Sequence, residues 1–174
     1  MKLIKLVLVC LILMSCNSPR AIYDYDQSIS FKGFNTYGLY PDFQSELSAL
    51  DETRLIESLR EGMKNNGFSI SEQPDIYVNA YSREYIDQNR SRVGIGIGGG
   101  SGNVGVGVSG GIPLENNTKI LEITIDFINA QEDALIWQAV VESKINLNAS
   151  PQERRAMFEK IVEKALKGYP PEKN

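Results

Sequence analysis

A regular alternation of apolar and polar residues in the C-terminal half of the chain constrains the fold most. It runs from Leu121 to Phe127, and after the turn-like residues 129–133 a second strand-like stretch runs from Leu135 to Ile145. Alternation with a period of two predicts a strand with one buried face, and two such strands joined by a short turn predict an antiparallel hairpin. The chain must therefore build a sheet and cover one face of it.

Two amphipathic helices are also predicted, one before this hairpin in the sequence and one after it. The first spans residues 51–65, where apolar residues recur at helical spacing, and Gly67 follows as a left-handed stop. The second begins at a capping box formed by Ser150 and Glu153, with Pro151 at the first helical position, and ends before Gly168. Both helices need a sheet against which to bury their apolar faces.

Three further stretches read as strands, at residues 22–26, 34–40 and 74–81. The order of elements is then strands, helix, strand, glycine-rich insert, hairpin and helix. This order predicts an α+β fold, a two-layer sandwich in which two amphipathic helices cover one face of a mostly antiparallel sheet. A glycine-rich hairpin is expected as an insert.

The N-terminus has the pattern of an export signal. Lys2 and Lys5 accompany an apolar run from Leu6 to Met14. This run is about half the roughly 20 residues that a membrane-spanning helix needs. It closes on Ser15 and Cys16, which resemble the lipobox of bacterial lipoproteins, so we expect cleavage before Cys16 and a diacylglycerol on its sulfur.

The domain plan follows from these features. Residues 1–15 are the signal peptide, and residues 16–21 are the lipidated cysteine and a short tether. Residues 22–171 are a single α+β domain by length, in which residues 91–112 form a glycine-rich hairpin or flexible insert. Residues 172–174 are a tail.

The chain expected after signal-peptide cleavage lacks the residue types that several kinds of catalytic and metal site require. The sequence contains no histidine, and Cys10 leaves with the signal peptide, so Cys16 is the only remaining cysteine. Disulfides, thiol nucleophiles, Cys/His zinc sites and histidine-dependent triads are therefore not expected. We expect no cofactor and no metal site. The net charge of −4 and the lack of a basic cluster argue against nucleic-acid binding.

Ten of the fifteen glycines lie between Gly94 and Gly111, in two arms around a turn. The segment matches G-x-G-x-x-G twice, but the residues that follow, Ile112-Pro113-Leu114, do not read as the start of a helix, so a dinucleotide site is rejected. Either the segment is a flexible insert, or its apolar strip is a contact surface for a partner strand, for self-association or for lipid. The residues of that strip are Val93, Ile95, Ile97, Val104, Val106 and Val108.

Other conspicuous side chains have ordinary structural interpretations. Asp24 and Asp26 point the same way on one strand, but a calcium site needs six to eight oxygens, so a solvated strand face is favoured. Glu122 and Asp126 are interpreted as a solvated face for the same reason. Trp137 in mid-strand is expected in the core. Four charged residues near the glycine segment are expected to serve solubility or to meet lipid headgroups or acidic glycan: Arg83, Glu84, Arg90 and Arg92.

Taken together, the lipobox and six short motifs resemble the bacterial lipoprotein family of domain of unknown function 4136. The motifs are Tyr23-Asp24-Tyr25-Asp26, Phe34-x-Thr36-Tyr37, Gly67-Phe68, Pro74-Asp75, Leu135-Ile136-Trp137 and Gly168-Tyr169-Pro170-Pro171. The resemblance implies a periplasm-facing envelope lipoprotein with an α+β domain and no established activity.

The expected function is non-enzymatic protein binding or scaffolding in the cell envelope, at the outer membrane facing the periplasm. The expected contacts are the membrane, through the lipid on Cys16, and an envelope protein or a second copy, through the glycine-rich hairpin. The alternative is a module that binds glycan, peptidoglycan or lipid. A carboxylate-based hydrolase comes third, because it needs two acidic groups about 5–10 Å apart in one cleft.

Overall fold

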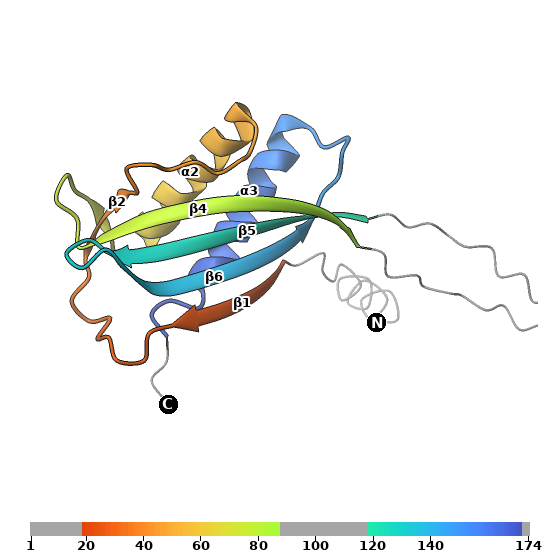
Figure 1. The fold of residues 1–174 in the computed structure, drawn as a ribbon. Coiled ribbons are helices and arrows are strands. Elements are labelled where there is room, and N and C mark those ends of the chain that lie inside the picture. The colour runs from red at the N-terminus through yellow and green to blue at the C-terminus, as the bar shows by residue number, and fades with distance from the viewer. Residues whose placement is uncertain (1–18, 88–117, 172–174) are drawn as a thin grey trace, which may run out of the picture.

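The computed structural model describes residues 19–87 and 118–171, which form six strands and two helices (Figure 1). The strands are β1 (Arg20–Tyr25), β2 (Thr36–Leu39), β3 (Ser69–Ile70), β4 (Ile76–Asp87), β5 (Thr118–Asn129) and β6 (Ala134–Lys144). The helices are α2 (Ala49–Asn65) and α3 (Pro151–Leu166).

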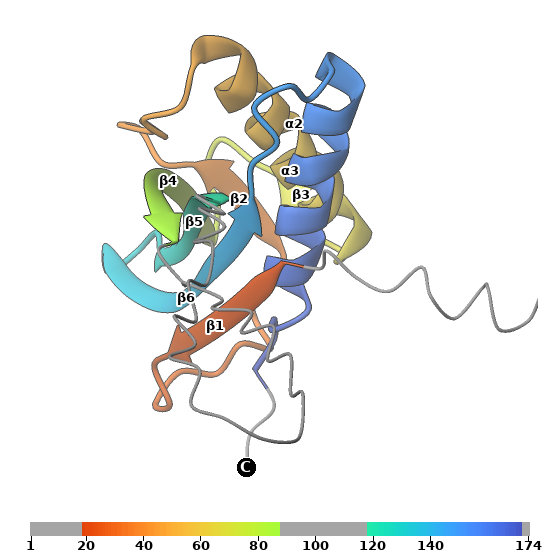
Figure 2. The same cartoon turned by 90° about the vertical axis from the view of Figure 1, so that its right-hand side faces the viewer.

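The six strands form a single sheet in the order β1-β6-β5-β4-β2-β3. The β1–β6, β6–β5 and β5–β4 pairs are antiparallel, whereas β2 joins β4 and β3 joins β2 in parallel. Figures 1 and 2 show both helices on the same face of the sheet. The predicted two-layer α+β fold is therefore confirmed, and the predicted glycine-rich hairpin lies outside the described residues.

The hairpin predicted from the alternating residues is β5–β6. Its register places Phe127 opposite Trp137. A shift in register between Phe127 and Ile128 accommodates one extra residue of β6 near the turn, which is the geometry of a β-bulge. Period-two alternation alone does not reveal such an insertion.

Both helices begin at serine caps. The Ser48 side chain accepts the backbone N–H of Asp51, so α2 begins two residues before the predicted start. Ser150 and Glu153 form the predicted capping box of α3. Gly67 has a φ of 85°, which confirms the predicted left-handed stop after α2.

The core between helices and sheet is apolar and rich in aromatic rings. Trp137 and Phe127 are fully buried, with ring centroids 4.6 Å apart. Tyr169, just after α3, packs its ring against both at 5.6 and 5.0 Å. Its hydroxyl is buried without a hydrogen-bond partner among the described residues, and burial raises its pKa to about 12.

β1 begins at Arg20, two residues before the predicted strand. Arg20 and Ala21 also pair with β6, at Glu142 and Val141. Two residues of the predicted tether, Arg20 and Ala21, are therefore part of the strand. On the helix side of β1, the Tyr23 hydroxyl donates to the Lys164 carbonyl at 2.6 Å. A Cβ on Gly168 would lie 2.4 Å from the Tyr23 ring, so only glycine permits this approach.

Candidate functional site

An open groove of about 1100 Å³ lies along β4, beyond the point where β2 stops pairing with it. β2 pairs with β4 only from Ile76 to Val78, whereas β4 continues to Asp87. The groove is lined by residues from four segments: 46–54 at the start of α2, 81–84 of β4, 122–124 of β5, and 149–154 at the start of α3. The amino ends of both helices therefore meet the sheet here.

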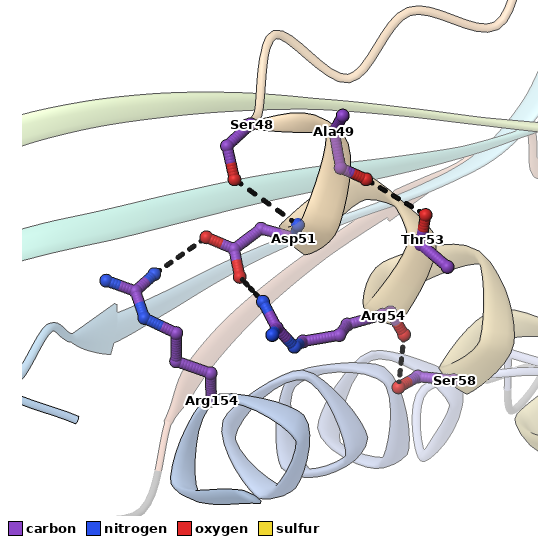
Figure 3. A network of polar contacts seen from close by, with 7 residues as sticks. All are labelled: Ser48, Ala49, Asp51, Thr53, Arg54, Ser58 and Arg154. Carbon is purple, nitrogen blue, oxygen red and sulfur yellow. Dashed lines mark hydrogen bonds and ion pairs between the residues drawn. The ribbon is translucent and has the colours of Figure 1, made fainter. Parts of the chain in front are cut away.

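Asp51 joins the two helices at the groove (Figure 3). One carboxylate oxygen accepts from Arg54 at 2.6 Å, and the other accepts from Arg154 of α3 at 2.7 Å. The Asp51 side chain is only 12% exposed, and Arg54 is 17% exposed. A charge-assisted bond on each oxygen offsets the cost of removing this carboxylate from water.

Two more ion pairs line the sheet side of the groove. Arg83 of β4 contacts Glu122 of β5 at 3.0 Å, with the arginine side chain 70% exposed. Glu84 is paired with Lys119 across the same two strands. Because the Arg83 side chain is largely exposed, it is available to exchange its partner when another molecule binds.

The groove also offers apolar contacts and an open strand edge. Leu50 is 70% exposed and Tyr81 is 41% exposed, and both belong to the lining. The backbone N–H of Ser82 donates to the Ser45 carbonyl at 2.9 Å. In residues 19–87 and 118–171, no strand pairs with β4 on this side beyond Val78. A strand edge that carries no neighbouring strand is a template for an added one.

The described residues contain no group of three or more His, Cys, Asp or Glu side chains arranged to hold a metal ion. Within the same part of the chain, no helix has the length and apolar character needed to cross a membrane.

The residues chosen from sequence as lipidation and interaction sites lie outside the described residues. These are Cys16, Val93, Ile95, Ile97, Val104, Val106 and Val108. They stay predictions.

Asp24 and Asp26 are both exposed, as the solvated-face interpretation predicts. Asp24 accepts the backbone N–H of Tyr25 at 2.9 Å. Asp26 accepts the hydroxyl and the backbone N–H of Ser28, and these hydrogen bonds lower its pKa. Each carboxylate thus accepts hydrogen bonds from a residue one or two positions further along the chain.

The solvated-face interpretation of Glu122 and Asp126 is only partly correct. Both lie on the sheet face opposite the helices, but Glu122 is 16% exposed and Thr124 between them is 5% exposed. β5 is a central strand, so long side chains of its neighbours cover this face. Asp126 accepts from Gln138 at 2.8 Å, and burial raises its pKa.

Trp137 lies in the core, as its mid-strand position predicts, and its indole N–H donates to the Gly168 carbonyl at 3.2 Å. The sequence interpretation did not single out Asp51, Arg54 or Arg154. One signal could have found them: Arg154 lies at the fourth position of α3, near the positive end of the helix dipole. A cation there needs a carboxylate partner.

Among protein-family profiles, the domain of unknown function DUF4136 matches residues 21–171. The chain belongs to the DUF4136 family. The resemblance inferred from the short motifs is therefore confirmed over the whole of the predicted domain, residues 22–171. A comparison with curated proteins finds no match.

Solved structures that align with this DUF4136 chain include two proteins. A PDZ domain protein from Parabacteroides distasonis aligns with a TM-score of 0.51 at 15% identity, over 90% of this chain and 37% of that one. The likeness is one of fold, and the DUF4136 chain spans only 37% of that protein. Two structures of the PelC dodecamer from Paraburkholderia phytofirmans align at TM-scores of 0.44 and 0.42, with 8% and 10% identity. Both alignments cover 84% of this chain and 96% of the PelC chain.

Proposed function

We propose that this chain is a lipid-anchored envelope protein whose DUF4136 domain binds a protein partner in the groove beside β4. The observation that carries the proposal is the combination found there: an open strand edge, exposed Leu50 and Tyr81, and the accessible Arg83. Backbone pairing, apolar contact and charge recognition are the three means by which an extended polypeptide is held on a sheet edge. The proposed anchor is Cys16, at the outer membrane and facing the periplasm.

The charges in the groove support binding over catalysis. Three of its four carboxylates, Asp51, Glu84 and Glu122, are held in ion pairs with arginine or lysine. A carboxylate-based hydrolase needs one acid and one base that face the substrate. The mature chain also lacks the histidine and the free thiol that most other hydrolases use.

The topology supports a partner close to the membrane. Arg20 begins β1 four residues after Cys16. Across the sheet, Arg20 pairs with Glu142, Glu142 with Glu122, and Glu122 with Arg83 of the groove. In Figure 1, β1 starts at the end of the sheet where β4 ends and β5 begins. The groove and the point where the tether enters the domain are therefore at the same end of the sheet.

The glycine-rich segment is connected at this end as well. It follows Asp87 of β4 and precedes Thr118 of β5, three residues beyond Glu84 of the groove. We propose that its apolar strip adds to the contact surface. Deletion of residues 94–111 is expected to weaken partner binding, and unchanged binding after the deletion would exclude this role.

Photocrosslinking tests the groove. A photoreactive amino acid at Leu50, in the lipidated full-length protein in its own membranes, is expected to give one discrete adduct with another protein. The matched control is Ile70 of β3, which is 65% exposed and does not line the groove. Arg83→Glu is expected to reduce the Leu50 adduct at least fivefold. Equal adducts from both positions, or an adduct unaffected by Arg83→Glu, would refute the proposal.

A glycan ligand is the second candidate, and the open sheet face favours it. No helix in the described part of the chain covers this face, where exposed Tyr81 lies near the hydrogen-bonded Asp126 and Gln138. An aromatic ring beside polar groups suits a sugar. Binding of soluble peptidoglycan fragments that disappears in Tyr81→Ala would support this candidate, and no binding to the unsubstituted protein would exclude it.

A further inference from the structure

β1 is an exposed edge long enough to accept another strand. Among the described residues it pairs with β6 on one side and with no strand on the other. The opposite edge of the sheet is β3, which is only two residues long. Natural sheets usually shorten, cover or charge their edges to prevent pairing, yet Ile22 in the middle of β1 is 70% exposed. A partner strand on β1 would cover it.

The backbone of β1 determines which groups such a strand can use. The Asp26 N–H donates to a carbonyl of β6 at 3.0 Å, so Asp26 and every second residue before it face β6. Ala21, Tyr23 and Tyr25 therefore turn their backbone groups outward. The Tyr25 N–H is already bound by the Asp24 side chain. The N–H and C=O groups of Ala21 and Tyr23 are left for an added strand.

The side chains on the outer face of β1 carry complementary charges. Arg20, Ile22 and Asp24 all point to the face opposite the helices, and all three are exposed. Arg20 forms no ion pair among the described residues. Four residues of strand separate Arg20 from Asp24 by about 13 Å, so these two charges cannot meet within one copy.

We propose that β1 pairs in antiparallel fashion with β1 of a second copy, with the two-fold axis at Ile22. In this register Ile22 faces Ile22 of the second copy, and Arg20 of each copy faces Asp24 of the other. Ala21 faces Tyr23, and this pair exchanges two backbone hydrogen bonds on each side of the axis. The same patch serves both copies, as a two-fold interface requires.

In neighbouring registers, fewer backbone and charged groups of β1 find a partner in the second copy. A shift by one residue sets Ala21 against Asp24, whose backbone groups face β6, so the hydrogen bonds between the copies are lost. A shift by two residues sets Ile22 against Asp24 and requires the Tyr25 N–H, which is already bound. The register centred on Ile22 is therefore the one that the charges and the backbone favour together.

The pairing goes beyond the groove proposal and does not depend on it, because β1 contributes no residue to the groove. The lipid proposed on Cys16 would hold both copies in one membrane and raise their effective concentration. Failure of the groove test leaves the β1 pairing standing, and failure of the β1 test leaves the groove standing.

Cysteine crosslinking tests the register. Directly opposed residues of a non-hydrogen-bonded pair lie about 4.5 Å apart at Cα, within the range that a disulfide bridges. In membranes containing the full-length protein, Ile22→Cys is expected to give a disulfide-linked homodimer at least tenfold above the control Leu147→Cys, whose native side chain is 68% exposed. Dimer at the control level, or an adduct with a different protein, would overturn the proposal.

A charge swap tests the same register independently. In the Ile22→Cys background, Arg20→Asp and Asp24→Arg are each expected to reduce the homodimer at least fivefold, because each opposes two like charges. The double variant, Arg20→Asp with Asp24→Arg, restores opposite pairs and is expected to return the dimer to within twofold of the parent. Absence of rescue, in variants whose circular dichroism matches the parent, would also overturn the proposal.

Discussion

The two ends of the helix pair are held together by different chemistry. At the amino ends, Asp51 of α2 meets Arg154 of α3, and the groove remains open beside them. Towards the carboxyl ends, Gly62 of α2 packs so closely on α3 that a Cβ would lie 2.7 Å from Val162 and 2.8 Å from Leu166. The amino ends are joined by an ion pair beside the larger groove, whereas the carboxyl ends are joined by a close apolar contact beside a smaller groove of about 430 Å³.

This difference separates stability from binding. Apolar packing depends on shape and tolerates little change, so the carboxyl ends fix the two helices and the sheet beneath them. Ion pairs at the rim of a groove keep charged groups in place and still accessible to a ligand. The polar end is therefore suited to binding, and substitutions at the two ends should have different consequences.

The largest loss of stability is expected from Trp137→Ala. Trp137 is fully buried under the carboxyl end of α3 and contacts Phe127, Tyr23 and Tyr169. Removing it should lower the free energy of unfolding by about 3–5 kcal/mol, measured by urea denaturation. Leu135→Ala, at a 52% exposed position of the same strand, is the control and should cost far less. Equal losses would contradict the placement of Trp137 in the core.

Gly62→Ala tests the close helix contact. The added methyl group meets side chains of α3 at 2.7 and 2.8 Å, so about 1–3 kcal/mol of stability should be lost. A second substitution, Val162→Ala, removes the Val162 methyl group that makes one of these two contacts. Relative to Val162→Ala alone, the added cost of Gly62→Ala should then be smaller. The same cost in both backgrounds would show that the contact is not the cause.

Asp51→Asn tests the polar end. The amide cannot balance the two guanidinium groups, but Arg154 is 31% exposed and water can solvate it. The expected loss of stability is about 1–2 kcal/mol. In the Arg154→Gln background, Asp51→Asn should lower the free energy of unfolding by less. A double-mutant cycle, measured by urea denaturation, gives this difference. A coupling of zero would mean that the ion pair does not join the helices.

The smallest effect on stability is expected at Asp126 of β5, which belongs to neither end of the helix pair. Burial raises the pKa of Asp126 above its ordinary value of 3.8, so its ionisation at neutral pH opposes folding. Asp126→Asn should therefore raise the melting temperature at pH 7, by no more than about 2 °C. The gain should shrink as the pH falls through the raised pKa and vanish below 3.8. A gain that persists below that pH would point to another cause.

Local patterns in the sequence predicted the fold class and every described element except the two-residue strand β3. The serine caps, Gly67 and the β5–β6 alternation act through neighbouring residues, so the sequence shows them directly. The parallel pairing of β2 with β3 and β4 depends on residues far apart in the chain, and no local pattern predicted it. The groove escaped prediction for the same reason, because Asp51 and Arg154 meet only after both helices pack.

The most direct test compares binding and stability in the same two variants. The yield of the Leu50 crosslink and the melting temperature are measured for Arg83→Glu and Gly62→Ala in the full-length protein. The account predicts that Arg83→Glu loses the adduct at least fivefold with a melting temperature within about 2 °C of the parent, since exposed ion pairs contribute little stability. Gly62→Ala should melt lower and keep its adduct below the transition. A full adduct yield in Arg83→Glu, or a lost adduct in folded Gly62→Ala, would contradict the separation of binding from stability.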